Sequence, residues 1–139
     1  MRLHALLLIT CVVFAGCDSP SDPSSGVPFT VTDLVEGTGA EATNGQTLTM
    51  NYTGWLYDAN APDNKGVVFD TTDGRGPFSF LLGTGQVIQG WDQGLVGMKV
   101  GGTRRLIIPP ELAYGDQGAG GVIPPNATLI FDVELLGVQ

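Results

Sequence analysis

The feature that most constrains the fold is an alternation of apolar and polar side chains with a period of two. It is clearest near the C-terminus, where Leu129, Phe131, Val133 and Leu135 are separated by Ile130, Asp132 and Glu134. The same period appears in 48–53 and 78–82, and shorter apolar stretches occupy 29–35, 67–70 and 103–108. This period is typical of strands with one buried face, so the sequence predicts a sheet of five to six strands.

Only 87–98 has the spacing of a helix, with Trp91 and Leu95 four residues apart on one face. Gly90, Gly94 and Gly97 interrupt it, and each glycine costs a helix about 1 kcal/mol relative to alanine. Something other than helix propensity must therefore place the indole, and we interpret the segment as the floor of an apolar pocket. Since strands and helices do not alternate, we predict an α+β fold in which an antiparallel sheet curls over one short helix.

The N-terminal segment has the features of an export signal. A short, weakly basic start precedes about 12 nearly unbroken apolar residues, too few to cross a bilayer that requires ~20. Phe14-Ala15-Gly16-Cys17 resembles the lipobox of bacterial lipoproteins, which implies cleavage before Cys17 and acylation of its thiol. The alternatives are ordinary secretory cleavage with a free Cys17, or an uncleaved anchor.

This interpretation divides the chain into three parts: a signal peptide at 1–16, an acylated Cys17 with a flexible tether to 28, and one folded domain at 29–139. The tether is rich in Ser, Pro and Asp and has too few apolar side chains to form a core. We expect the domain to be lipid-anchored in a bacterial cell envelope, facing the periplasm or the exterior.

The residue inventory excludes much enzyme chemistry. His4 and Cys11 lie in the predicted signal peptide, so the mature chain has no histidine, and Cys17 is its only cysteine. Catalytic triads, Cys-His dyads and conventional zinc sites are thereby excluded, and we expect no metal and no other cofactor.

The charge balance argues against nucleic acid as a partner. Removing Arg2 with the signal peptide leaves five basic residues against 14 acidic ones, a net charge of −9 with no basic stripe. We expect Arg104 and Arg105 to be exposed on a strand, and Asp132 and Glu134 to form a solvated face. Attachment to a membrane would depend on the lipid anchor alone.

Six sequence blocks, in order, resemble the FKBP-type peptidyl-prolyl cis-trans isomerases. The blocks are Tyr52-Thr53-Gly54, Val68-Phe69-Asp70-Thr71-Thr72, Pro77-Phe78-Ser79-Phe80, Val87-Ile88-Gln89-Gly90-Trp91, Ala113-Tyr114-Gly115 and the segment 123–136. They span most of 29–139. The resemblance implies a half-barrel sheet around the helix, with a shallow aromatic pocket for a prolyl ring.

The resemblance also implies roles for individual residues. Catalytic roles fall to Tyr52, Asp70, Trp91, Tyr114 and Phe131. Substrate-binding roles fall to Phe69, Phe78, Val87, Ile88, Val122 and Ile123. Trp91 would be the floor, the Ile88 N–H and the Tyr114 hydroxyl would donate to substrate carbonyls, and Asp70 would accept from Tyr52. Implied partners are proline-containing polypeptides and macrolides like tacrolimus or rapamycin, and we expect a monomer.

The implied reaction suits a chain without histidine. Rotation about an X–Pro bond faces a barrier of about 18–20 kcal/mol, and it requires no nucleophile and no proton transfer. The alternative function is a non-catalytic module that binds proline-containing segments of an envelope partner. The two alternatives share the same pocket.

Overall fold

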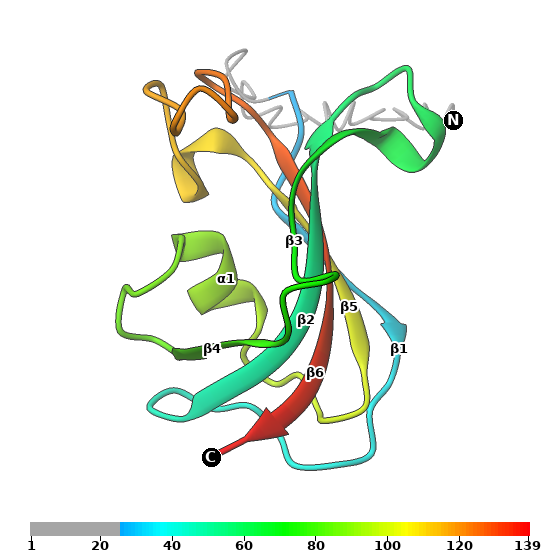
Figure 1. Cartoon of the computed structure of the whole chain (residues 1–139), viewed down its shortest axis with the longest axis vertical. Coiled ribbons are helices and arrows are strands. Elements are labelled where there is room, and N and C mark those ends of the chain that lie inside the picture. Colours follow the sequence, from blue (N-terminus) through cyan, green and yellow to red (C-terminus); the bar gives the residue numbers. More distant parts are fainter. Residues whose placement is uncertain (1–25) are drawn as a thin grey trace, which may run out of the picture.

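The computed structural model describes residues 26–139. They form a six-stranded antiparallel sheet that wraps around one short helix (Figure 1). The strands are β1 (Thr30–Val35), β2 (Thr47–Tyr57), β3 (Lys65–Thr71), β4 (Phe78–Leu81), β5 (Thr103–Ile108) and β6 (Leu129–Val138); the helix is α1 (Gln89–Gly94), and 3-10 turns cover Pro62–Asn64 and Pro110–Leu112. The predicted α+β fold is confirmed. The predicted signal peptide, Cys17 and most of the tether lie outside the described residues.

The long strand β2 organises the sheet. The strand order is β1-β5-β6-β2-β3, and β4 also pairs with β2. β2 has 11 residues. Its first half pairs with β4, as in Met50 with Phe78, and its second half pairs with β3, as in Thr53 with Thr71. Two partners on one side of one strand bend the sheet, so that it closes over α1.

The predicted alternation places the inner residues of each strand in one core. Apolar side chains from β2, β4, β5 and β6 meet the helix on the inner face of the sheet. The fully buried ones include Leu48, Met50, Leu82, Leu95, Leu106, Ile108, Leu129, Val133 and Leu135.

The helix is shorter than the predicted 87–98. It ends at Gly94, and Gly97 has a φ of +84°, a left-handed conformation that stops a helix. Two of its glycines allow a close approach to β5. A Cβ at Gly90 would lie 2.5 Å from Ile108 Cγ2, and a Cβ at Gly94 would lie 2.8 Å from Leu106 Cδ2. The glycines that lower the helix propensity therefore also let α1 approach β5 closely, and this close approach packs Trp91 against the sheet.

The expectation for Arg104 is wrong. Its side chain is only 10% exposed, and its Nε donates to Asp33 Oδ1 at 2.7 Å. Its Nη1 donates to the carbonyls of Gly94 and Val96, at 2.9 and 3.1 Å. Because the last carbonyls of a helix have no partner within the helix, Arg104 satisfies the end of α1 from β5.

The expectation that Asp132 is simply solvated is also wrong. Its carboxylate accepts from Arg105 Nε at 2.7 Å, from Arg105 Nη2 at 2.9 Å and from Lys65 Nζ at 2.9 Å. Burial alone would raise the pKa of Asp132, but the hydrogen bonds from Arg105 and Lys65 outweigh it and hold that pKa below its usual value. The other predicted outer residue, Glu134, is exposed.

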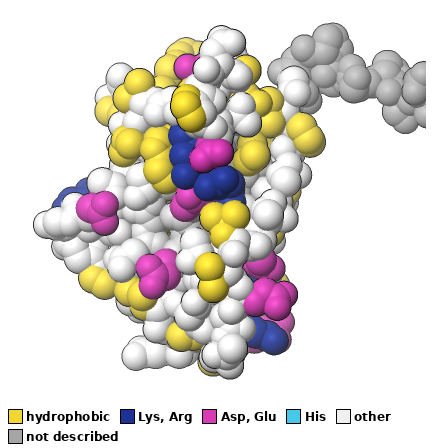
Figure 2. Space-filling view, turned by 90° about the vertical axis from the view of Figure 1, so that its right-hand side faces the viewer, with side chains coloured by type: hydrophobic (Ala, Val, Ile, Leu, Met, Phe, Trp, Pro, Cys, Tyr) yellow, Lys and Arg dark blue, Asp and Glu magenta, His cyan; other side chains and the backbone are white. Residues whose placement is uncertain are grey.

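The Lys65–Asp132–Arg105 ion cluster joins strands β3, β6 and β5 on the outer face. Lys65 Nζ also lies 4.1 Å from the centre of the Trp55 ring. Figure 2 shows basic and acidic side chains gathered among hydrophobic ones on the side of the molecule opposite α1. No helix within residues 26–139 is long and apolar enough to span a membrane.

Candidate functional site

A cavity of about 180 Å³ opens where α1 meets β2, β3 and β6. It is lined by Tyr52, Phe69, Asp70, Phe78, Gln86, Val87, Ile88, Trp91, Tyr114 and Phe131. All five residues predicted to be catalytic therefore lie around one space, together with four of the six predicted to bind substrate. Gln86 was not predicted.

A bulge in β3 brings two consecutive side chains to the cavity. Gly54 pairs with Asp70 and Trp55 pairs with Val68, so that Phe69 is an extra residue without a partner in β2. In a regular strand, successive side chains point to opposite faces, and a bulge redirects one of them. Phe69 and Asp70 can both line the cavity for this reason.

The aromatic rings form a connected set around Trp91. Its ring centre lies 4.8 Å from that of Tyr52 and 5.1 Å from that of Phe131, with interplanar angles of 79° and 80°. Phe69 meets Phe131 edge-to-face at 5.4 Å. Such arrangements are favourable for aromatic pairs and fix the ring orientations. Trp91 is 4% exposed, and its indole N–H has no partner among residues 26–139.

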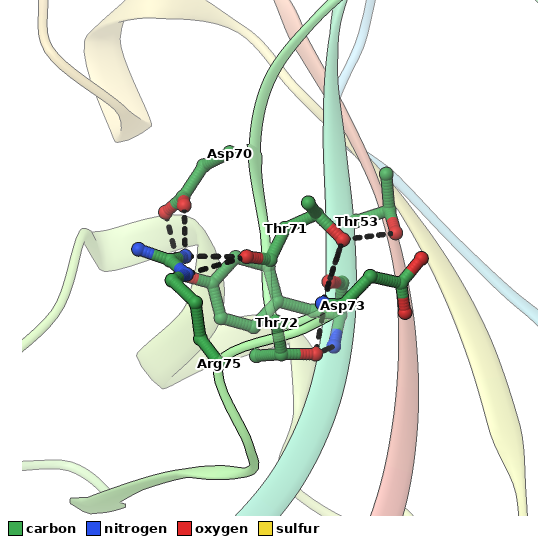
Figure 3. Close-up of polar contacts among 7 residues, drawn as sticks. Thr53, Asp70, Thr71, Thr72, Asp73 and Arg75 are labelled. Carbon is green, nitrogen blue, oxygen red and sulfur yellow. Dashed lines mark hydrogen bonds and ion pairs between the residues drawn. The ribbon is translucent and has the colours of Figure 1, made fainter.

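The acidic group of the cavity is held from two sides. Asp70 Oδ2 accepts from the Tyr52 hydroxyl at 2.5 Å, and Asp70 Oδ1 accepts from Arg75 Nη2 at 2.5 Å. Arg75 also donates to the Thr71 carbonyl, which ties the turn after β3 to its own strand (Figure 3). Burial, and next the hydrogen bond to Asp70, raise the pKa of Tyr52 to about 12, so Tyr52 remains a donor at neutral pH.

Sequence reasoning missed Arg75. The available indication was its spacing, since a cation five residues after Asp70 across a turn with Gly74 and Gly76 can fold back onto the carboxylate. Nothing in the alternation pattern pointed to it.

The remaining polar groups at the cavity are hydrogen-bond donors without partners. Within the described part of the chain, the Ile88 N–H, the Tyr114 hydroxyl and the Gln86 NH2 group donate no hydrogen bond. Burial, and next the negative charge of Asp70, raise the pKa of Tyr114, so its hydroxyl keeps its proton. The cavity is thus lined mainly by aromatic and aliphatic side chains, with hydrogen-bond donors among them and with its carboxylate already engaged.

Two predicted substrate-binding residues, Val122 and Ile123, do not line the cavity. Ala119 accepts from the Ile123 N–H and donates to the Ile123 carbonyl, each at 3.0 Å, which makes a tight loop. This loop turns Ile123 into the core, where it is 7% exposed, and leaves Val122 55% exposed.

A second cavity is larger and has a different character. It measures about 250 Å³, lies between β1 and the end of α1, and contains no aromatic side chain. Asp33, Glu36, Lys99 and Arg104 are among the residues that line it. Among residues 26–139, no group of three or more His, Cys, Asp and Glu side chains has an arrangement that could hold a metal ion.

The chain is similar in sequence and in fold to known proteins. The family model described as FKBP-type peptidyl-prolyl cis-trans isomerase matches residues 39–136. The chain is 55% identical over 109 residues to an FK506-binding protein of Neisseria meningitidis serogroup A, which covers 78% of this chain and 94% of that protein. It is 44% identical over 140 residues to FK506-binding protein 2 of Dictyostelium discoideum, over the full length of both. The crystal structure of AtFKBP13 matches with a TM-score of 0.70 at 42% identity, over 83% of this chain and 96% of that one.

Proposed function

The chain belongs to the FKBP-type peptidyl-prolyl cis-trans isomerases, and we propose that the cavity around Trp91 is its active site. An enzyme of this family interconverts the cis and trans forms of X–Pro peptide bonds. The prolyl ring of the substrate would enter the cavity with Trp91 beneath it and Tyr52, Phe69, Phe78 and Phe131 around it.

The observation that carries this assignment is the polarity of the cavity. Proline has no backbone N–H, so the segment around an X–Pro bond offers carbonyl acceptors and few donors. The cavity offers the reverse, with free donors at Ile88 and Tyr114 beside aromatic rings. The two surfaces are therefore complementary in hydrogen bonding as well as in apolar character.

The chemistry follows from the barrier. Even a ten-thousand-fold acceleration requires ~5.5 kcal/mol of stabilisation that favours the twisted amide over the planar one. A single neutral hydrogen bond contributes about 0.5–1.5 kcal/mol, so the Tyr114 hydroxyl cannot supply it alone. Twisting reduces the amide dipole. A cavity that excludes water therefore destabilises the planar amide more than the twisted one.

The Asp70 group would contribute by position. Tyr52 and Arg75 hold its carboxylate in place at the cavity wall, facing the space where the bond would rotate. We assign Asp70 the role of a fixed negative charge near the substrate carbonyl carbon. The relatives named FK506-binding proteins suggest that macrolides of the tacrolimus type would occupy the same cavity.

We further propose that the enzyme acts outside the cytoplasm, held by a lipid on Cys17. The support is the apolar run before Phe14-Ala15-Gly16-Cys17, and exported polypeptides would then be its substrates. The lipid anchor is tested by growing bacteria that express the protein with a radiolabelled fatty acid. Wild-type protein should carry the label and partition with membranes, whereas a Cys17→Ser variant should do neither; an unlabelled wild type would refute the lipid anchor.

The test of the active site is exchange between the cis and trans forms of a short X–Pro peptide, followed by NMR. The purified protein should accelerate exchange, and Asp70→Ala and Phe131→Ala should each lower the rate while the circular dichroism spectrum stays native. Full activity in both variants would refute the site. A folded wild type that binds the peptide without accelerating exchange would instead support a non-catalytic binding module.

A further inference from the structure

Gln86 is the only residue lining the cavity around Trp91 that has a side-chain amide, and one hydrogen bond orients this exposed amide. It lies in the segment between β4 and α1, and its Oε1 accepts from the Leu81 N–H at 3.0 Å. A backbone N–H can only donate, so the oxygen of the amide must face Leu81. The NH2 group is then the part of the amide left to face the cavity mouth and the solvent.

The segment that carries Gln86 is also held in place. Asp92 on α1 accepts from the Gly83 N–H and the Gly85 N–H, each at 2.9 Å. Together with the bond from Leu81, these contacts fix the segment to β4 at one end and to α1 at the other. The Gln86 NH2 group is thus a preorganised donor, two residues before the free N–H of Ile88.

The charged groups nearby have partners. Asp70 at the cavity is paired with Arg75, and both oxygens of Asp92 accept from backbone N–H groups. Among residues 26–139, the Gln86 NH2 group is therefore the polar side-chain group at this side of the mouth that makes no hydrogen bond.

From this arrangement we propose that Gln86 determines substrate preference. It selects X–Pro segments in which a residue next to the proline has an acceptor side chain, above all Asp or Glu. This inference rests on the proposed function of the cavity. An amide donor facing a carboxylate makes a charge-assisted bond, whereas a lysine side chain offers it only further donors.

The experiment compares kcat/KM for three peptides that differ only beside the proline, with Glu, Leu or Lys at the preceding position, and again at the following one. Wild-type protein should prefer Glu to Lys at one of these positions by about two- to fivefold, since an exposed hydrogen bond from a neutral amide to a carboxylate should contribute no more than an exposed ion pair does. Gln86→Glu keeps an acceptor for Leu81 and replaces the NH2 group by a negative oxygen. It should reverse the preference to Lys over Glu by a similar factor.

Gln89→Glu is the matched control. It adds the same charge three residues along the chain, at an exposed position that does not line the cavity. It should keep the wild-type ranking. The affinities of the same peptides are also measured, through the change in tryptophan fluorescence on binding. The preference can then be determined without turnover.

The outcomes separate the two proposals. No preference in the wild type, or the same shift in Gln86→Glu and Gln89→Glu, would overturn the role of Gln86. Failure of the wild type to accelerate exchange of the Leu peptide would count against the proposed function, while the binding ranking would still decide the role of Gln86.

Discussion

Replacing Gly54 with alanine should deform the cavity from the side of strand β2. Gly54 lies in β2, and a Cβ there would sit 2.7 Å from Phe69 Cζ and 2.8 Å from Phe131 Cε1. Carbon atoms prefer about 3.5–4.0 Å, so each ring would have to move by about 1 Å. Phe131 is 3% exposed and packed in the core, which leaves the partly exposed Phe69 to move into the cavity.

The magnitude follows from two opposing effects. Overpacking costs about 1–3 kcal/mol, while the loss of backbone freedom in the unfolded chain returns about 0.4–1 kcal/mol. We expect Gly54→Ala to lower the free energy of unfolding by about 1–2 kcal/mol in urea titrations. Its kcat/KM should fall about tenfold to a hundredfold, because a displacement of 1 Å at a site can have that effect.

Gly137→Ala is the matched control for this substitution. Gly137 lies in β6, and a Cβ there would meet nothing within 4 Å. This variant should be as stable as the wild type or slightly more stable, with unchanged kcat/KM. The reasoning is refuted if Gly54→Ala matches Gly137→Ala in both measurements.

Three further outcomes follow from the same structure. Gly90→Ala should destabilise the domain by about 1–3 kcal/mol in urea titrations, because its Cβ would lie 2.5 Å from Ile108 Cγ2; a wild-type midpoint would contradict the close packing of α1. Since the pKa of Asp132 is lowered in the folded chain, its ion pairs stabilise the fold above an unfolded pKa of about 3.9, and this contribution is lost as the pH falls through the folded pKa. Asp132→Asn should therefore lose less stability than the wild type on acidification below about pH 4, and parallel curves would refute the ion cluster. With a pKa of about 12, Tyr52 should ionise late in an ultraviolet titration, and Tyr52→Phe should remove the step at highest pH.

The alternation of side chains predicted the strands well, because successive residues of a half-buried antiparallel strand face the core and the solvent in turn. Thr103–Ile108 has the predicted bounds, and β6 extends only three residues beyond Leu135. The same reasoning could not predict the bulge at Phe69, since alternation presupposes a regular strand. The resemblance supplied Phe69 and Asp70 together, and the bulge explains how both line the cavity.

Side chains whose roles depend on distant partners were the least predictable. Arg104 and Arg105 are neighbours in sequence, yet one satisfies the end of α1 and the other binds Asp132 on the opposite face. These two pairings require the register of the sheet, which the sequence alone did not specify. Gln86 and Arg75 contact partners only five residues away, Leu81 and Asp70, but both lie in irregular segments where the alternation of side chains predicts no orientation.

The helix beneath the cavity has six residues and two glycines packed against β5. Isolated helices shorter than about 12 residues are marginal in water, so α1 has no independent stability. The indole floor thus exists only while the sheet exists, and the cavity cannot persist in a partly unfolded chain. Transplanting Gln89–Gly94 onto another scaffold would not transfer the site, because Trp91 is positioned by the packing of α1 against Leu106 and Ile108 of β5.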